Sequence, residues 1–316
     1  MAINWYPGHM HKASKEMKKM IPDVDLIIEV LDARIPFSSE NPMLAEIRGD
    51  KPCIKVLSKS DLADPELTQQ WQDYLEQEKN VKTIALTIQQ PEQMRDILDL
   101  CRKMLPAKES SVKNIQAMIM GIPNVGKSTL INTLAGRQIA KTGNEPAVTK
   151  MQQRIKLEGG IVLHDTPGVL WPNLENRHGG YRLAITGAIK ETAISNDDIA
   201  MYAVDYLRRA YPDLLKQRYE LDVLPEDEIK LLEMIGAKRG CLRSGGMVDV
   251  DRAAKILLTE FRSATIGHIS LETPEMMEQE IIEMLQIRQQ KEAKKLARKN
   301  KRHSSRQNNE IERVSK

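Results

Sequence analysis

The sequence predicts an α/β fold in which a doubly wound, mostly parallel sheet is followed by a small all-α domain and a basic tail. Short apolar runs alternate with helical stretches over the first half of the 316-residue chain, the pattern of a sheet covered by helices on both faces. After about Tyr181 the strand-like runs stop, while amphipathic helical patterns continue. Residues 288–316 contain eleven Lys and Arg residues and three Glu residues, which gives this segment a charge of +8 in a chain of net charge +3.

The expected strands are short apolar runs that lead into polar or glycine-containing segments. They cover residues 26–31, 53–57, 83–87, 115–120 and 161–163. The helices expected among them cover residues 65–78, 92–104 and 127–134, and those of the second domain cover 199–210, 226–235 and 251–261. We therefore expect a sheet domain over 1–178, a helical domain over 179–274, and a tail over 275–316 that begins as a helix and is disordered from Arg302.

Composition excludes several classes of protein. No apolar run reaches the roughly 18 residues that a membrane span needs, and the N-terminus lacks the basic-then-apolar layout of a signal peptide. Cys53, Cys101 and Cys241 are scattered without a CxxC pair, which argues against disulfides and a zinc site. We expect a cytoplasmic protein that acts as a monomer and has no membrane partner.

A glycine-rich loop over residues 121–128, GIPNVGKS, is the strongest motif. It follows an apolar strand and opens a helix, as a phosphate-binding loop requires, because its backbone N–H groups wrap the phosphates at a helix N-terminus. Lys127 would reach the β- and γ-phosphates and Ser128 would ligate Mg²⁺. The nucleotide-binding residues predicted here are Asn124, Val125, Gly126, Lys127, Ser128 and Thr129.

A second motif, DTPG over residues 165–168, follows its own strand. Asp165 is expected to hold the metal, and the N–H of Gly168 to lie near the γ-phosphate. Many GTPases place next a Gln that positions the attacking water, but here the residue is Val169, which cannot hydrogen-bond to water. The catalytic group must come from elsewhere; His164 is one candidate, although its neighbours indicate a strand position facing away from the phosphates.

A base-recognition motif is formed by Ser58, Lys59, Ser60 and Asp61. The Asp61 carboxylate would accept hydrogen bonds from guanine and the Lys59 stem would cover the ring, so adenine would leave a buried acceptor mismatched. Ser58 stands where GTPases usually have Asn, and a hydroxyl reaches less far than an amide, which puts the tie to the phosphate loop in question. Leu86 and Thr87 match a further loop of GTPases, whose backbone N–H contacts the guanine oxygen. The plainer alternative is that these two residues are only the end of a strand.

The order of these motifs is unusual, because the base-recognition motif precedes the phosphate loop. A circular permutation explains it, since the termini of a domain often lie close together and can be joined without moving the strands. At residues 5–10, 32–36, 121–134, 165–172 and 238–241 the chain resembles the circularly permuted GTPases, and among them the ribosome biogenesis GTPase A family. The resemblance spans residues 2–274; Ser58, and Ala147 in the switch segment, depart from the family's pattern.

The resemblance implies a bacterial factor that binds GTP or GDP with Mg²⁺ and hydrolyses GTP weakly until a large ribosomal subunit stimulates it. It assigns Thr149 to Mg²⁺ and the γ-phosphate, His9 to the attacking water, and Asn124 to a K⁺ ion beside the phosphates. Each has a plainer alternative: His9 as an exposed residue at a helix start, and Asn124 as an ordinary loop residue. The implied partner is a precursor of the large subunit, with its rRNA and ribosomal proteins.

Two features leave the function open. The basic tail and four lysines, Lys12, Lys15, Lys18 and Lys19, are candidates for rRNA contact, or are simply solvated surface. Val169 and Ser58 favour an alternative function as a nucleotide-gated RNA-binding scaffold with negligible turnover. A signalling or RNA-modifying GTPase is a further alternative, against which the absence of a second catalytic motif in the helical domain counts.

Overall fold

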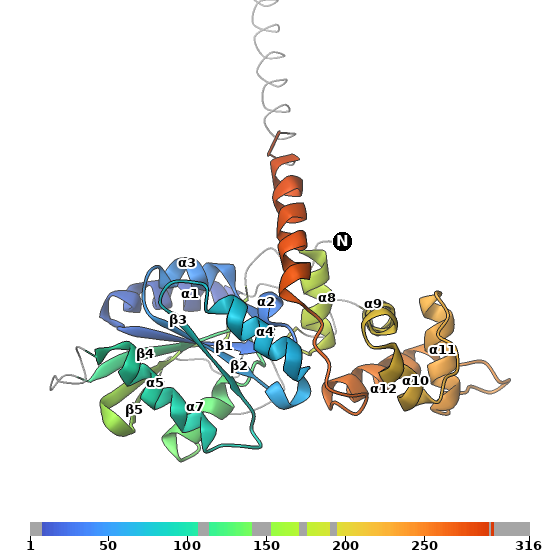
Figure 1. The fold of residues 1–316 in the computed structure, drawn as a ribbon, viewed down its shortest axis with the longest axis horizontal. Coiled ribbons are helices and arrows are strands. Elements are labelled where there is room, and N and C mark those ends of the chain that lie inside the picture. The colour runs from blue at the N-terminus through green and yellow to red at the C-terminus, as the bar shows by residue number, and fades with distance from the viewer. Residues whose placement is uncertain are drawn as a thin grey trace, which may run out of the picture. The chain divides into compact units, whose positions relative to one another are not determined.

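The computed structural model describes residues 8–106, 114–140, 153–170, 176–189, 195–290 and 292–293. The chain forms two compact units, Met1–Thr273 and Pro274–Lys316. Figure 1 shows the fold, with the sheet and its helices in the first unit. Within the described ranges, none of the helices has both the length and the apolar character that crossing a bilayer requires.

A six-stranded sheet in the order β3-β2-β1-β4-β6-β5 forms the centre of the first unit. Neighbouring strands are parallel except for the pair of β5 and β6, which is antiparallel. The strands are β1 (Leu26–Asp32), β2 (Cys53–Ser58), β3 (Val81–Leu86), β4 (Ile115–Met120), β5 (Gln153–Leu157) and β6 (Ile161–Asp165). The predicted doubly wound α/β class is therefore confirmed, with β5 as an edge strand that the sequence did not predict.

Helices cover both faces of this sheet, with α1 and α3 on one side and α5 and α7 on the other (Figure 1). These helices begin at residues suited to the position: in α4, Pro65 stands in the first turn and Asp64 accepts hydrogen bonds from the N–H groups of Glu66 and Leu67. The predicted helix 92–104 begins instead as a short 3₁₀ turn, Gln93–Arg95. The helices are α1 (Gly8–Met20), α2 (Pro36–Ser39), α3 (Pro42–Arg48), α4 (Pro65–Leu75), α5 (Asp96–Met104) and α7 (Lys127–Ala135).

A group of helices follows the sheet. These are α8 (Arg177–Ile185), α9 (Asn196–Ala210), α10 (Pro212–Tyr219), α11 (Glu228–Lys238) and α12 (Val250–Arg262). In this described part of the chain, an isolated antiparallel bridge between Leu242 and Val248 is the extent of β structure. Helices α9, α11 and α12 correspond to the three expected ones; α8 and α10 were not expected, and the boundary set at 178/179 falls inside α8.

The second unit begins with a helix over residues 274–290. This agrees with the start of the predicted helix 275–301. Residues 294–316, which contain most of the basic tail, lie outside the described residues.

Buried charges interrupt the apolar interior of the sheet. Glu29 on β1 lies in register with Lys55 on β2, and the Lys55 ammonium contacts Glu40 at 2.8 Å and Glu78 at 3.2 Å. Burial, with the nearby charge of Glu40, raises the pKa of Glu29 to about 8 although Lys55 and Arg48 oppose the shift. Burial therefore favours the neutral form of the Glu29 carboxyl.

A second buried acid joins the helices to the sheet. Glu272 is fully buried and accepts hydrogen bonds from the N–H groups of Phe37 at 2.9 Å and Ser38 at 3.1 Å. Arg182 of α8 lies 3.5 Å from the same carboxylate, and the indole of Trp71 donates to the backbone oxygen of Glu272 at 3.1 Å. Glu272 thus caps α2 and binds α8 at once, which fixes the helices against the sheet.

Candidate nucleotide-binding site

The candidate site lies where four parallel strands end at one edge of the sheet. Asp32, Ser58 and Asp165 are the last residues of β1, β2 and β6, and Gly121 follows β4 directly. The chain order diverges between β1 and β4, which are neighbours in the sheet. This is a topological switch point, where doubly wound folds bind their ligands. Motifs far apart in the sequence therefore meet at the place where a nucleotide is expected.

The glycine loop is closed by backbone contacts. A side chain at Gly121, whose φ is +150°, would place its Cβ 2.5 Å from the carbonyl oxygen of Val30, so only glycine fits. The buried ammonium of Lys127 donates to the carbonyl oxygens of Gly121 at 3.0 Å and Ile122 at 2.6 Å. The loop is thus wrapped around its own lysine at the start of α7.

Asp165 and Lys127 form the charged floor of the loop. Burial raises the pKa of Asp165 to about 6, with Lys127 opposing, and burial lowers the pKa of Lys127 to about 8, with Asp165 opposing. Both carboxylate oxygens of Asp165 are buried and have no hydrogen-bond partner among the described residues. A buried, unsatisfied carboxylate is costly in isolation and suits a hard cation. With the Ser128 hydroxyl, Asp165 is therefore a donor set that fits Mg²⁺.

The DTPG segment packs directly on the glycine loop. A Cβ at Gly168 would lie 2.9 Å from the backbone nitrogen of Pro123 and 3.1 Å from the Lys127 ammonium. The N–H of Val169 donates to the Gly121 carbonyl at 3.3 Å, and its carbonyl accepts from the Asn41 amide at 2.7 Å. Val169 itself is fully buried, so it neither reaches nor orients a water molecule. Asn41 was not predicted as part of the site.

Ser58 ties the base-recognition loop to the glycine loop. Its hydroxyl oxygen lies 2.8 Å from the carbonyl oxygen of Leu31 and 2.5 Å from that of Val125. A Cβ at Gly126 would lie 3.8 Å from Ser58, so the two loops approach closely. The Ser58 hydroxyl therefore connects the two loops, although it is shorter than the Asn side chain that GTPases usually have at this position.

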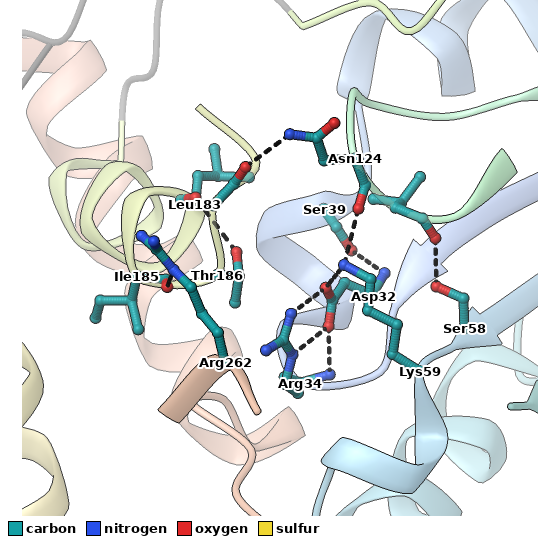
Figure 2. A network of polar contacts seen from close by, with 12 residues as sticks. Asp32, Arg34, Ser39, Ser58, Lys59, Asn124, Leu183, Ile185, Thr186 and Arg262 are labelled. Carbon is teal, nitrogen blue, oxygen red and sulfur yellow. Dashed lines mark hydrogen bonds and ion pairs between the residues drawn. The ribbon is translucent and has the colours of Figure 1, made fainter. Parts of the chain in front are cut away.

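Lys59 is held at both sides of its ammonium group. Its backbone is left-handed, with φ of 57°, and its ammonium donates to the Asp32 carboxylate and to the Asn124 carbonyl, each at 2.8 Å. Arg34 binds the same carboxylate through Nε at 2.9 Å and Nη2 at 2.8 Å, as Figure 2 shows. Burial alone would raise the pKa of Asp32, but Arg34 and Lys59 hold that pKa far below its usual value. The sequence assigned no role to Asp32 or Arg34.

Asp61 and the end of β3 lie in one loop cluster. Asp61 stands in the 3₁₀ turn Ser60–Leu62 and accepts from the side-chain amide of Gln89 at 3.2 Å. Leu86 is in register with Ser58 on the neighbouring strand, and the N–H of Gln89 donates to the Thr87 hydroxyl at 3.1 Å. Gln89, which the sequence did not indicate, thus joins the two predicted parts of the base site.

Asn124 links the glycine loop to the helices. Its side-chain amide donates to the Gly187 carbonyl at 2.9 Å, just beyond the end of α8.

His164, the alternative candidate for the catalytic group, lies on β6, and its ring contacts the Gln116 amide oxygen at 3.0 Å. Burial, followed by the charge of Arg154, lowers the His164 pKa. Thr129 lies in the first turn of α7.

The side chains of two predicted site residues lie outside the part of the chain that the structure describes. The backbone of His9 belongs to the first turn of α1, and its side chain lies outside the described residues. Thr149, with Ala147, also falls outside them.

Together, the sheet order and these loops define a circularly permuted P-loop GTPase. A family model described as "50S ribosome-binding GTPase" matches residues 116–235. The chain is 47% identical over 287 residues to "Ribosome biogenesis GTPase A" of Priestia megaterium, an alignment that covers 88% of this chain and 99% of the relative. It is 31% identical to the protein of the same name in Thermotoga maritima, over 86% and 95% of the two chains. The chain belongs to the ribosome biogenesis GTPase A family.

Solved structures agree with this assignment. The structure of GNP-bound YlqF from Thermotoga maritima has a TM-score of 0.59 and 27% identity, covering 84% of this chain and 99% of that one. A GDP-bound YlqF structure has a TM-score of 0.60 and 26% identity, covering 82% and 99%. The two YlqF structures, one GNP-bound and one GDP-bound, have a fold similar to this one.

Proposed function

We propose that this protein acts late in the assembly of the large ribosomal subunit, binding the precursor in the GTP state and leaving when the subunit stimulates hydrolysis. The observation that carries the proposal is the junction of the base-recognition loop and the glycine loop. Ser58 and Lys59 contact the backbone of Val125 and Asn124 directly, so base and phosphates would be bound by one connected unit. The names of the relatives support the ribosomal part.

The residues of the site take separate roles in this proposal. Lys127 would exchange its two carbonyl contacts for the β- and γ-phosphates, and Asp61 would accept from the guanine edge. Ser128 and Asp165 would hold Mg²⁺, with Thr149 joining them in the GTP state. A bound Mg²⁺ supplies positive charge at the phosphates as the bond to the γ-phosphate breaks.

Two further roles complete the hydrolysis proposal. His9 would orient the attacking water, because the buried Val169 cannot do so. Asn124 would help to hold K⁺ beside the phosphates, through its side-chain oxygen while its nitrogen donates to Gly187. Both roles come from the resemblance to circularly permuted GTPases.

The proposed RNA contact begins on α1. One face of this helix is buried through Met10, Ala13 and Met17, while the opposite face is exposed and carries four lysines, Lys12, Lys15, Lys18 and Lys19. A row of lysines on a solvent-facing helix binds phosphate backbones without reading sequence. We propose that this face and the basic tail bind rRNA.

A nucleotide-gated RNA-binding scaffold remains the second candidate, because the buried Val169 leaves the place after Gly168 without a group that orients water. A turnover assay with GTP and with ATP, with and without purified large subunits, separates the two. The GTPase proposal expects GTP turnover that subunits increase at least about tenfold, in line with effects of completing a catalytic site. Subunit binding with no increase in turnover would favour the scaffold, and an equal rate with ATP would contradict guanine recognition.

A further inference from the structure

We propose that Asp32 and Arg34 are positioning residues for guanine recognition, which hold Lys59 in place and make its position depend on the packing of α12. This inference rests on the proposed guanine site. It assigns a role to two buried residues to which the sequence motifs give no part in nucleotide binding. Figure 2 shows the contacts of Asp32 with Arg34 and Lys59, and further contacts of Arg34 lead to the helices that follow the sheet.

The first step is the restraint on Lys59. A lysine side chain has four rotatable bonds, and ordering it costs rotamer entropy. Here the ammonium lies between the Asp32 carboxylate and the Asn124 carbonyl, at 2.8 Å from each. The stem is therefore fixed before a nucleotide arrives, so that binding does not have to order it.

The second step is the orientation of the Asp32 carboxylate. One oxygen accepts from the backbone N–H and the Nε of Arg34, at 3.1 and 2.9 Å, and the other accepts from Arg34 Nη2 and Lys59. The N–H of Asp32 donates to the Ser39 hydroxyl at 3.0 Å. Removing the negative charge would leave the Arg34 and Lys59 cations side by side in a buried place, where they repel strongly. Lys59, the more exposed of the two, would be displaced.

The third step joins Arg34 to the helices. Its carbonyl accepts from the N–H of Leu271 at 2.8 Å, and its guanidinium lies 5.5 Å from the centre of the Phe261 ring on α12. The next residue, Arg262, donates to the carbonyls of Ala184 and Ile185 at 2.9 and 2.8 Å.

These contacts close a ring. The segment after α8 continues to Gly187, whose carbonyl accepts from Asn124 of the glycine loop. Helix α12 is thus connected to the nucleotide loops twice, through Arg34 and Asp32 to Lys59, and through Arg262 and α8 to Asn124. A shift of α12 would move both connections together.

A double-mutant cycle tests the inference. GDP affinity is measured by titration calorimetry for the wild type, Asp32→Asn, Lys59→Met and the double variant. If Asp32 acts through Lys59, Asp32→Asn weakens GDP binding about tenfold or more alone but less than about twofold in the Lys59→Met background. Asp25→Asn is the matched control, because Asp25 lies beside the opposite end of β1 and accepts from the Gln116 N–H; it should not change affinity. Equal losses in both backgrounds would overturn the proposal.

Inosine diphosphate provides a readout that general damage would not reproduce, because it lacks the amino group that Asp61 is proposed to bind. Asp32→Asn should weaken GDP and inosine diphosphate equally, whereas Asp61→Asn should lower the preference for GDP. A preference for GDP that collapses in Asp32→Asn would contradict a role through Lys59. Wild-type protein that binds ADP as tightly as GDP would instead overturn the guanine site.

Arg34→Lys keeps the charge but loses the paired contact, and serves if Asp32→Asn does not fold. It should weaken GDP binding by about threefold to tenfold, again only when Lys59 is present. A loss of the same size in the Lys59→Met background would overturn the proposal.

Discussion

The hydroxyl oxygen of Ser58 lies 2.5 Å from the carbonyl oxygen of Val125. The same hydroxyl lies 2.8 Å from the Leu31 carbonyl, so a single proton is shared between β1 and the glycine loop. Because Ser58 ends β2, this contact joins two strands and the phosphate loop at one atom. A short side chain is sufficient there because the loops approach so closely.

Ser58→Ala should weaken GDP binding by about threefold to tenfold, since it removes one hydrogen bond of about 0.5–1.5 kcal/mol from the junction of the loops. Titration with GDP measures the change. Ser263→Ala, which removes a hydroxyl bonded within the end of α12, serves as the control and should bind as the wild type does. Unchanged affinity in Ser58→Ala would show that the junction does not depend on this hydroxyl.

Removal of magnesium tests the role of Asp165. With chelator present, wild-type protein should bind GTP at least about tenfold more weakly, because a divalent ion is the largest local charge at the phosphates. Asp165→Asn should show little further loss on chelation, because its metal site is already damaged. Magnesium titrations at a fixed GTP concentration measure the loss of GTP affinity for the wild type and for Asp165→Asn. A variant that responds to chelation as strongly as the wild type would exclude Asp165 as the metal ligand.

His9→Ala should leave nucleotide affinity nearly unchanged and lower subunit-stimulated turnover by about 10²-fold or more, as expected for the loss of a group that positions water. Stimulated GTP hydrolysis under saturating GTP measures the effect. Val169→Ala is the matched control within the site and should change turnover little, because this buried side chain does not reach the water. Wild-type turnover in His9→Ala would mean that a group supplied by the subunit does this work.

The buried Glu29 carboxyl makes the free energy of unfolding depend on pH, in a direction that follows from its raised pKa. The unfolded carboxyl ionises near pH 4.3, while the native pKa is raised to about 8 by burial, so the native state binds more protons between these values. The free energy of unfolding therefore falls as pH rises through this window, and Glu29 contributes no further change above pH 8.

Glu29→Gln should remove this fall in the free energy of unfolding. Between pH 5 and pH 8, we expect the free energy of unfolding of the variant to rise by at least about 1 kcal/mol relative to that of the wild type. Urea denaturation at the two pH values measures it. Glu233→Gln on the exposed face of α11 should follow the wild type at both. Parallel pH profiles for the wild type and Glu29→Gln would contradict the assignment.

Truncation after Gln286 tests the basic tail. The shortened protein should bind large subunits more weakly and with a shallower dependence on salt, because fewer counterions are released from the RNA. Its GTP affinity should stay unchanged, since the nucleotide loops all lie in the first unit. Subunit affinity and salt slope equal to those of the full chain would show that the tail only aids solubility.

Strands β4 and β6, which lead into the glycine loop and the DTPG segment, could be predicted because most of their residues are apolar and buried. Strand β5 could not be, since Ile155 is its one buried residue and its neighbours are exposed or half-buried. Such an edge strand lacks the signal on which sequence patterns depend. The meeting of Ser58, Lys127 and Asp165 at one edge followed from parallel strands whose carboxyl ends coincide.

The partners of these residues could not be predicted in the same way. Asn41 contacts Val169 across 128 positions of sequence, and Arg34 depends on Phe261 and Leu271. No local period relates such residues, because their proximity follows from how the helices pack. Residues 32–36 carry part of the family resemblance, and only the contact of Asp32 with Lys59 indicates what this segment can do.

The cap that Glu272 provides for α2 has a consequence for synthesis of the chain. The N–H groups of Phe37 and Ser38 bind a carboxylate about 234 positions later, so during synthesis they have only water as a partner until residue 272 has left the ribosome. The strands near the N-terminus emerge early, yet the cap of α2 is completed only when Glu272 is available. Nascent chains arrested before residue 272 should therefore lack the cap of α2, and comparing their GTP binding with that of the released chain tests whether the nucleotide pocket depends on this cap.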